Sequence, residues 1–138
     1  MNTGRMSERE AASKNTEAVI RRLVEAWNGH ELEAFLDCFH PDYASTQLLF
    51  PELSFRGRDN VRERWSANFA MMPDFRADLL ALAVDGDTAW TEWHWHGTRP
   101  DGSRRDERGV VIYGLREGLI ATGRLYMSPG PDDSSRNS

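Results

Sequence analysis

The sequence predicts one α+β domain in which helices from the first half of the chain cover an antiparallel sheet formed by the second half. Two observations predict this fold class. Apolar residues recur at helical spacing up to about residue 72, and the pattern then changes to the two-residue alternation of strands. Four consecutive strands joined by hairpins need a cover on their apolar face, and the helices are the available cover.

Three helices are expected. Ser7-Glu8-Arg9-Glu10 fits a capping box for an early helical turn. The first main helix ends at Asn28-Gly29, and its apolar stripe consists of Val19, Ile20, Leu23, Val24 and Trp27. A short second helix must end before Pro41, because a proline ring disfavours a helical conformation in the preceding residue. The third runs from about Asp59 to Met72 and is closed by Pro73.

Five strands are expected, the first at residues 43–49. The other four lie at 75–84, 88–98, 107–115 and 119–128, and hairpin signals such as Asp101-Gly102 and Glu117-Gly118 separate them. The folded domain is therefore expected to span residues 15–128. The polar residues 1–14 are expected to be flexible, and the segment 129–138, rich in Pro, Gly, Asp and Ser, is expected to be a disordered tail.

Composition restricts the class of function. A chain of 138 residues can form one domain with a core and a small-molecule pocket. No apolar run approaches the ~20 residues of a membrane span, and the N-terminus lacks a secretory signal pattern, so a cytoplasmic location is expected. The net charge of −5 argues against a nucleic-acid partner. The single cysteine, Cys38, cannot form an internal disulfide and fits a reducing compartment.

The stretch 90–96, Trp-Thr-Glu-Trp-His-Trp-His, is the most informative in the chain. Alternate side chains of a strand point to opposite faces. One face of this strand therefore carries Trp90, Glu92, His94 and His96, and the other carries Thr91, Trp93 and Trp95. Whichever face lies inside, an acid and two imidazoles share one neighbourhood.

The succession of motifs resembles the SnoaL-like polyketide cyclases. These belong to the wider superfamily of nuclear transport factor 2, ketosteroid isomerase and limonene epoxide hydrolase. The motifs are the helix at 18–28, His40-Pro41-Asp42-Tyr43, Phe55-Arg56-Gly57, Trp93 followed by Gly97-Thr98, and Glu117-Gly118-Leu119-Ile120. The resemblance covers roughly residues 15–128. It implies a cone, with helices packed against a curved antiparallel sheet around an apolar pocket that takes a steroid-sized or polyketide-like molecule, without a cofactor or metal.

The chain also departs from that superfamily. Where ketosteroid isomerases carry a tyrosine, a ketone-polarising acid and a proton-transferring aspartate, this chain has Leu23, Val111 and Gln47. Where SnoaL-type cyclases and epoxide hydrolases carry an acid near the end of the last strand, it has Leu125. Any catalysis is therefore expected to use other residues.

Glu92 and His94 are the predicted catalytic pair. A two-residue turn at Asp101-Gly102 would place His96 opposite Glu107 and turn Glu92 and His94 into the cone. Their Cα atoms would then lie roughly 7 Å apart. His94 would transfer a proton at a carbon acid or carbonyl of a cyclic substrate, and Glu92 would orient it. The predicted substrate-binding residues are Gln47, Trp65, Phe69, Trp90, His96, Tyr113, Leu125 and Met127.

Three alternatives remain open. Glu92, His94 and His96 would lie on an outer face if the register shifted by one residue. The resemblance implies a homodimer through that outer sheet face. Glu92, His94 and His96, with Glu107, also have the residue types of a metal site. Finally, the missing family acids fit a non-catalytic domain that binds a small molecule or mediates an interaction.

Overall fold

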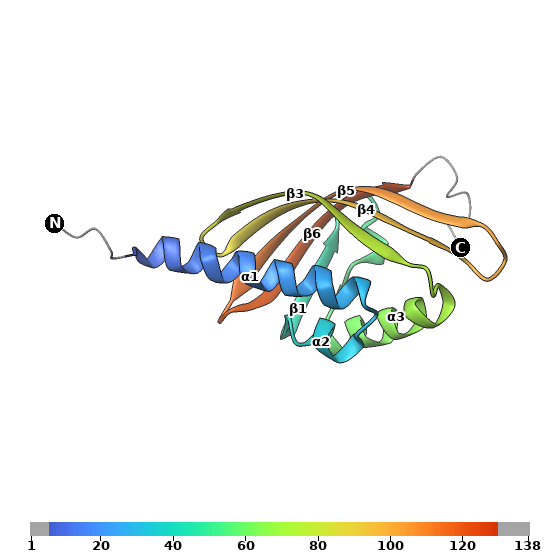
Figure 1. Cartoon of the computed structure of the whole chain (residues 1–138), viewed down its shortest axis with the longest axis horizontal. Helices are drawn as coiled ribbons and strands as arrows, with labels where there is room; N and C mark the ends of the chain where they lie inside the picture. The colour runs from blue at the N-terminus through green and yellow to red at the C-terminus, as the bar shows by residue number, and fades with distance from the viewer. Residues whose placement is uncertain (1–5, 130–138) are drawn as a thin grey trace.

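The structure, a computed structural model, describes residues 6–129 and consists of three helices on one face of a six-stranded sheet (Figure 1). The helices are α1 (Glu8–Asn28), α2 (Leu32–Leu36) and α3 (Arg58–Met71), with a short 3-10 turn at Pro51–Leu53. The strands are β1 (Phe39–Gln47), β2 (Phe55–Arg56), β3 (Arg76–Asp85), β4 (Thr88–Thr98), β5 (Arg104–Arg116) and β6 (Leu119–Pro129). The predicted α+β class and curved-sheet architecture are confirmed.

The first helix begins with the predicted capping box. The Ser7 hydroxyl accepts from the Glu10 backbone N–H, and the Glu10 carboxylate accepts from the Ser7 N–H at 3.0 Å. Residues 8–14, expected to be flexible, are therefore helical. The predicted tail lies outside the described residues from position 130 onward. Within residues 6–129, no helix has the length and apolarity needed to cross a membrane, and the cytoplasmic location stays a prediction.

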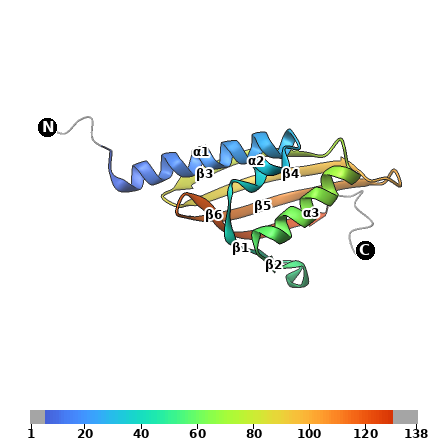
Figure 2. The same ribbon diagram turned by 90° about the horizontal axis from the view of Figure 1, so that it is seen from below.

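The sheet has the strand order β2-β1-β6-β5-β4-β3. All neighbouring pairs are antiparallel except β1 and β6, which are parallel. The register of that parallel pair shifts between Phe39 and Ala44, where Pro41 lies inside the strand. The short helix α2 ends before Pro41, as predicted. Figure 2 shows α1, α2 and α3 on the same face of the sheet. The inner face of the sheet is therefore covered by helices, and its outer face is not.

Aromatic rings make up much of the core between the sheet and the helices. Trp27 of α1 lies at the centre of this core, with its ring 5.0 Å from that of Trp65 and 5.2 Å from those of Phe35, Trp93 and Trp95, measured between centroids. Such tilted and edge-on contacts are the favoured geometry for aromatic pairs. The core thus joins α1, α2, α3 and β4 around one tryptophan.

Candidate functional site

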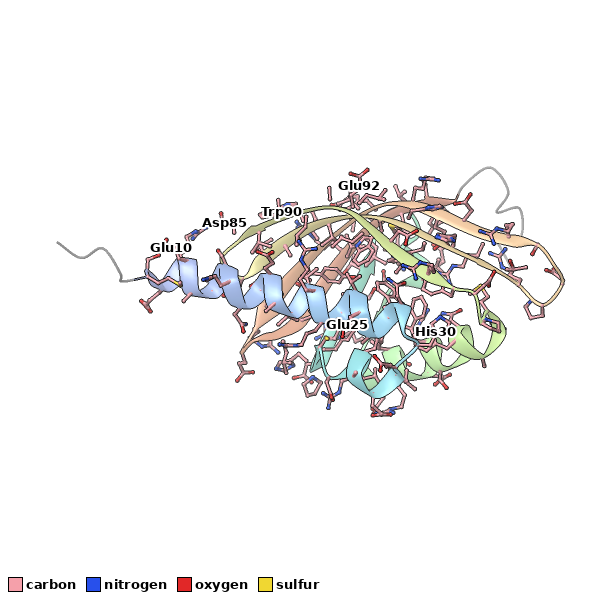
Figure 3. All side chains as sticks on the ribbon, in the orientation of Figure 1. Glu10, Glu25, His30, Asp85, Trp90 and Glu92 are labelled. Atoms are coloured by element: carbon pink, nitrogen blue, oxygen red, sulfur yellow. The ribbon has the colours of Figure 1, made fainter. Side chains whose placement is uncertain are left out.

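The inner face of β4 carries Thr91, Trp93 and Trp95. All three side chains are buried, Trp93 completely. The Trp93 indole N–H donates to Thr91 Oγ1 at 2.6 Å, and the Thr91 hydroxyl donates to the Val111 carbonyl oxygen at 2.7 Å. Figure 3 shows Trp90 and Glu92 on the side of the sheet that faces away from the helices. The odd-numbered residues of β4 therefore point into the molecule.

The predicted register of the β4–β5 hairpin is wrong by one residue. The strands are joined by residues 99–103, in which the Arg99 N–H donates to the Ser103 carbonyl oxygen at 2.9 Å, and not by a two-residue turn. His96 consequently pairs with Asp106, and Trp95 pairs with Glu107. A shift of one residue exchanges the two faces of a strand, which is why the faces of β4 are reversed from the prediction.

The predicted catalytic pair therefore does not point into the molecule. Glu92 is exposed on the outer face, and His94 lies on the same face with its Nε2 2.7 Å from Asp106 Oδ1. His96 and Trp90, predicted to contact substrate, are also on the outer face, and Trp90 is 42% exposed. The inward orientation predicted for these four side chains is wrong.

A cavity of about 310 Å³ lies between the helices and the inner face of the sheet. This volume is at the lower end of the range for small-molecule sites. The walls come from every helix and from all strands except β3. The lining residues are Trp27, Phe35, Phe39, Tyr43, Ser45, Gln47, Phe55, Val61, Arg64, Trp65, Asn68, Trp95, Arg105, Tyr113 and Leu125. The site is thus mainly aromatic, with a small number of polar groups.

Two buried tyrosines, Tyr43 and Tyr113, line the cavity. Burial raises the pKa of Tyr43 to about 12 and that of Tyr113 well above its ordinary value. The backbone leaves room for Tyr43 because residue 123 is glycine: a Cβ at that position would overlap the Tyr43 hydroxyl. Both phenols therefore stay protonated at neutral pH, when they can donate a hydrogen bond but cannot act as bases.

Trp27 and Trp95 add two buried indole N–H groups. Both rings line the cavity and both residues are at most 5% exposed. Among the described residues, neither indole nitrogen has a hydrogen-bond partner. A buried donor without a partner costs about 1–3 kcal/mol of stability. Each indole nitrogen is covered by surrounding protein atoms, so an acceptor in the cavity reaches it only if a side chain moves.

Arg105 and Glu107 form an ion pair on the inner face of β5. Arg105 Nη2 lies 3.0 Å from Glu107 Oε1, and the Glu107 residue is only 7% exposed. The Arg105 guanidinium also lies over the Trp65 ring at 5.6 Å from its centroid, and its Nη1 donates to Asn68 Oδ1 at 3.4 Å. The ion pair of Arg105 and Glu107 at the cavity was not predicted from the sequence. Their spacing of two residues on one strand places both on the same face, and this could have indicated the pair.

The other predicted substrate-binding residues divide into two groups. Gln47, Trp65, Tyr113 and Leu125 line the cavity. Phe69 and Met127 belong to the packed interior, where the Phe69 ring stacks on His30 at 4.5 Å between centroids. Leu23 and Val111 are fully buried.

The predicted metal ligands are not brought together. Glu107 lies on the inner face and His96 on the outer face, so one ion cannot contact both. The outer face instead brings His94 and His96 next to Asp78 of β3. These three residues could hold a metal ion.

Comparison with known proteins places this geometry in a family. A sequence profile of the SnoaL-like domain matches residues 20–122. Functionally curated proteins gave no match.

Solved structures show the same fold at low sequence identity. Bal32a, from a soil-derived mobile gene cassette, is 16% identical with a TM-score of 0.73, covering 84% of this chain and 91% of its own. A candidate SnoaL-like polyketide cyclase from Jannaschia sp. CCS1 is 15% identical with a TM-score of 0.72, covering 89% and 92%. IdmH from Streptomyces antibioticus, a candidate polyketide cyclase, is 21% identical with a TM-score of 0.69, covering 82% and 91%.

Proposed function

Because the chain belongs to the SnoaL-like domain family, we propose that its inner cavity binds a hydrophobic, ring-containing small molecule that presents a carbonyl oxygen. The observation that carries this proposal is the aromatic lining of the cavity, which includes Trp27 and Trp95 with their unpartnered indole N–H groups. The rings favour a flat, apolar ligand. The indoles and the protonated phenols of Tyr43 and Tyr113 are donors, so they favour an oxygen acceptor on it.

The proposed reaction is isomerisation or cyclisation by proton transfer next to that carbonyl, without a cofactor. Glu107, held by Arg105 on the inner face, would take the proton from the carbon beside the carbonyl. The electron pair of the broken C–H bond would move onto the carbonyl oxygen, where the buried donors would stabilise the negative charge. The candidate polyketide cyclases among the structural neighbours support this reaction class.

A cyclic ketone tests binding and proton transfer separately. With 1-tetralone in D₂O, proton NMR follows binding by line broadening and proton transfer by loss of the signal of the CH₂ beside the carbonyl. We expect the wild-type chain to accelerate this exchange and Glu107→Gln to slow it roughly 100-fold or more, while the variant still binds. Exchange at the wild-type rate in Glu107→Gln would remove Glu107 from the reaction.

Trp95→Phe tests the indole donor. Loss of one hydrogen bond of about 1–1.5 kcal/mol should weaken 1-tetralone binding roughly 5- to 10-fold. Trp93→Phe is the matched control, because Trp93 lies on the same face of the same strand but donates its N–H to Thr91. Equal effects of the two substitutions on affinity would contradict the role of Trp95.

A non-catalytic binding domain is the second candidate function. One observation favours it: the described residues that line the cavity include no aspartate, glutamate or histidine. Glu107 contacts Arg105, which lines the cavity. One carboxylate oxygen of Glu107 already accepts a hydrogen bond from the Arg105 guanidinium. Tight binding of 1-tetralone with no acceleration of exchange by the wild-type chain would support this second function over the enzyme.

We also propose that two copies pair through the outer face of the sheet. Trp90 and Tyr126 are 42% and 40% exposed on the sheet face that the helices do not cover. Exposed aromatic side chains of this size are typical of a contact surface. Trp90→Glu should convert the dimer to a monomer in analytical ultracentrifugation. Leu49→Glu is the control, because Leu49 is similarly exposed but precedes the 3-10 turn, off the sheet. A wild-type monomer at tens of micromolar would refute the pairing.

A further inference from the structure

Four ionisable side chains form a cluster on the outer face of the sheet, away from the cavity. This histidine–aspartate cluster consists of Asp78 on β3, His94 and His96 on β4, and Asp106 on β5. Asp78 is the cross-strand partner of His94, and Asp106 is the partner of His96. Cross-strand partners share a face, so three strands hold all four groups within one patch.

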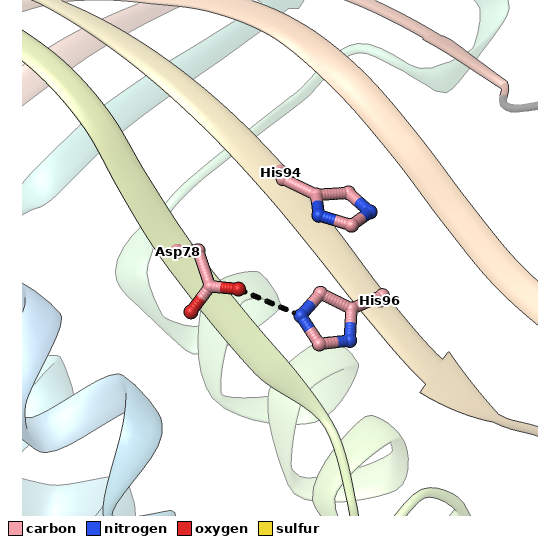
Figure 4. Close-up of side chains that lie close together, drawn as sticks. All are labelled: Asp78, His94 and His96. Carbon is pink, nitrogen blue, oxygen red and sulfur yellow. Dashed lines mark hydrogen bonds and ion pairs between the residues drawn. The ribbon is translucent and has the colours of Figure 1, made fainter.

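Asp106 fixes the proton on His94. His94 Nε2 lies 2.7 Å from Asp106 Oδ1, and an ionised carboxylate accepts hydrogen bonds, so Nε2 carries the proton. The other ring nitrogen, Nδ1, then has a free lone pair. Figure 4 shows the His94 ring with one nitrogen turned toward Asp78 and His96 and the other turned away from them. A carboxylate that orients a histidine in this way is the usual outer partner of a metal-binding imidazole.

The carboxylate of Asp78 and the imidazole of His96 lie next to His94. His96 Nε2 lies 2.8 Å from Asp78 Oδ2, while the second oxygen of Asp78 faces Arg76 Nε at 3.3 Å. The His94 and His96 rings lie 4.5 Å apart between centroids, and their planes are tilted by 30°. Two imidazoles and one carboxylate thus converge from two adjacent strands.

The distances fit a small transition-metal ion. The ligand atoms of Asp78, His94 and His96 all lie within 4.8 Å of one another. Tetrahedral zinc holds nitrogen and oxygen ligands at about 2.0–2.2 Å, which places neighbouring ligand atoms roughly 3.3 Å apart. Closing the three groups onto an ion needs movements of about 1 Å or less. The side chains of His94 and His96 are 20% and 21% exposed, so they are held in place yet reachable from solvent.

We propose that Asp78, His94 and His96 bind one zinc ion, or a similar divalent transition-metal ion, on the outer face of the sheet. Asp106 holds His94 in the tautomer that offers Nδ1, and solvent or another group takes the fourth position. The set of two imidazoles and one carboxylate favours zinc over calcium or magnesium, which prefer oxygen ligands. The ion would cross-link the edge strand β3 to β4, independently of any ligand in the cavity.

Zinc titration of the tag-free chain after chelator treatment tests this proposal. In competition with a chromophoric chelator, we expect one Zn²⁺ per chain, unaffected by millimolar Mg²⁺, and a rise in Tm, because an ion that binds only the folded state stabilises it. His94→Ala, His96→Ala and Asp78→Ala should each weaken zinc binding at least 100-fold. Asp106→Asn should weaken it about 10- to 100-fold, the usual effect of losing such a partner.

His40→Ala is the matched control. His40 Nε2 also pairs with a carboxylate, that of Glu117 at 2.9 Å, but it is outside the group of residues whose ligand atoms converge. Its removal should leave zinc affinity and stoichiometry unchanged, and circular dichroism checks that each variant is folded. No zinc bound at 1 mM, or folded cluster variants that bind zinc as the wild type does, would overturn the site. Wild-type affinity in Asp106→Asn would overturn the assignment of Nδ1.

Discussion

Replacing Thr91 by valine tests which face of β4 lies inside. The Thr91 hydroxyl accepts from the Trp93 indole N–H and donates to the Val111 carbonyl oxygen, and Thr91 is 1% exposed. Valine has nearly the same shape but can do neither. The substitution leaves the fully buried Trp93 N–H without its acceptor, and an orphaned buried donor costs about 1–3 kcal/mol. We expect the free energy of unfolding to fall by about that amount.

Urea denaturation followed by circular dichroism measures this loss. Thr88→Val, the same substitution on the outer face of the same strand, should change the free energy of unfolding by no more than about 0.5 kcal/mol. In a double-mutant cycle with Trp93→Phe, which removes the donor, the Thr91→Val cost should shrink by about 1 kcal/mol or more. A Thr91→Val variant as stable as Thr88→Val, or a cycle without coupling, would show that Trp93 does not donate to a buried Thr91.

Two further predictions concern Tyr43. Gly123→Ala places a Cβ against the Tyr43 hydroxyl and 3.3 Å from Cζ, so it should lower the free energy of unfolding by about 1–3 kcal/mol in urea denaturation. A Gly123→Ala variant as stable as the wild type would contradict this packing. Burial raises the pKa of Tyr43 to about 12. The phenol of Tyr43 therefore stays protonated in the folded chain at a pH above about 10, where the unfolded chain releases this proton. The contribution of Tyr43 to stability is complete below about pH 10 and is lost toward pH 12, at about 1.4 kcal/mol per pH unit. The Tm of Tyr43→Phe should therefore fall less steeply with pH over this range than that of the wild type. Equal slopes of Tm against pH would contradict the raised pKa of Tyr43.

The elements of the fold were predictable from local pattern. The capping box at Ser7–Glu10, the stop at Asn28-Gly29 and the closing Pro73 each act within a few residues, so the sequence alone locates the helix ends. The same holds for the β5–β6 hairpin at Glu117-Gly118, where both residues have positive φ. The parallel pairing of β1 with β6 was not predictable in this way, because it joins segments that are far apart in the chain.

The site was only partly predictable because it depends on register. Leu125 and Met127 alternate with Arg124, Tyr126 and Ser128, so β6 reveals its own inner face. Carrying that face to β4 requires the register of two hairpins. One contains a bulge between Gly114 and Leu115, and the other contains the loop 99–103. An error of one residue in the register of either hairpin reverses the predicted inner face of β4. The prediction for the β4–β5 hairpin contained that error.

Comparing the free energies of burying the two faces of β4 would have identified its inner face, with no need to know the register of the hairpins. Burying one tryptophan removes about 150–250 Å² from water, worth roughly 4–6 kcal/mol. Turning Trp93 and Trp95 inward buries two indoles and a threonine whose hydroxyl finds partners within the strand pair. Turning the other face inward would bury one indole, Trp90, together with Glu92 and two imidazoles, and an unpaired buried carboxylate costs several kcal/mol. Both terms favour the observed orientation, so the aromatic side of this strand lines the cavity, and its imidazoles are left on the outer face where carboxylates from β3 and β5 can reach them.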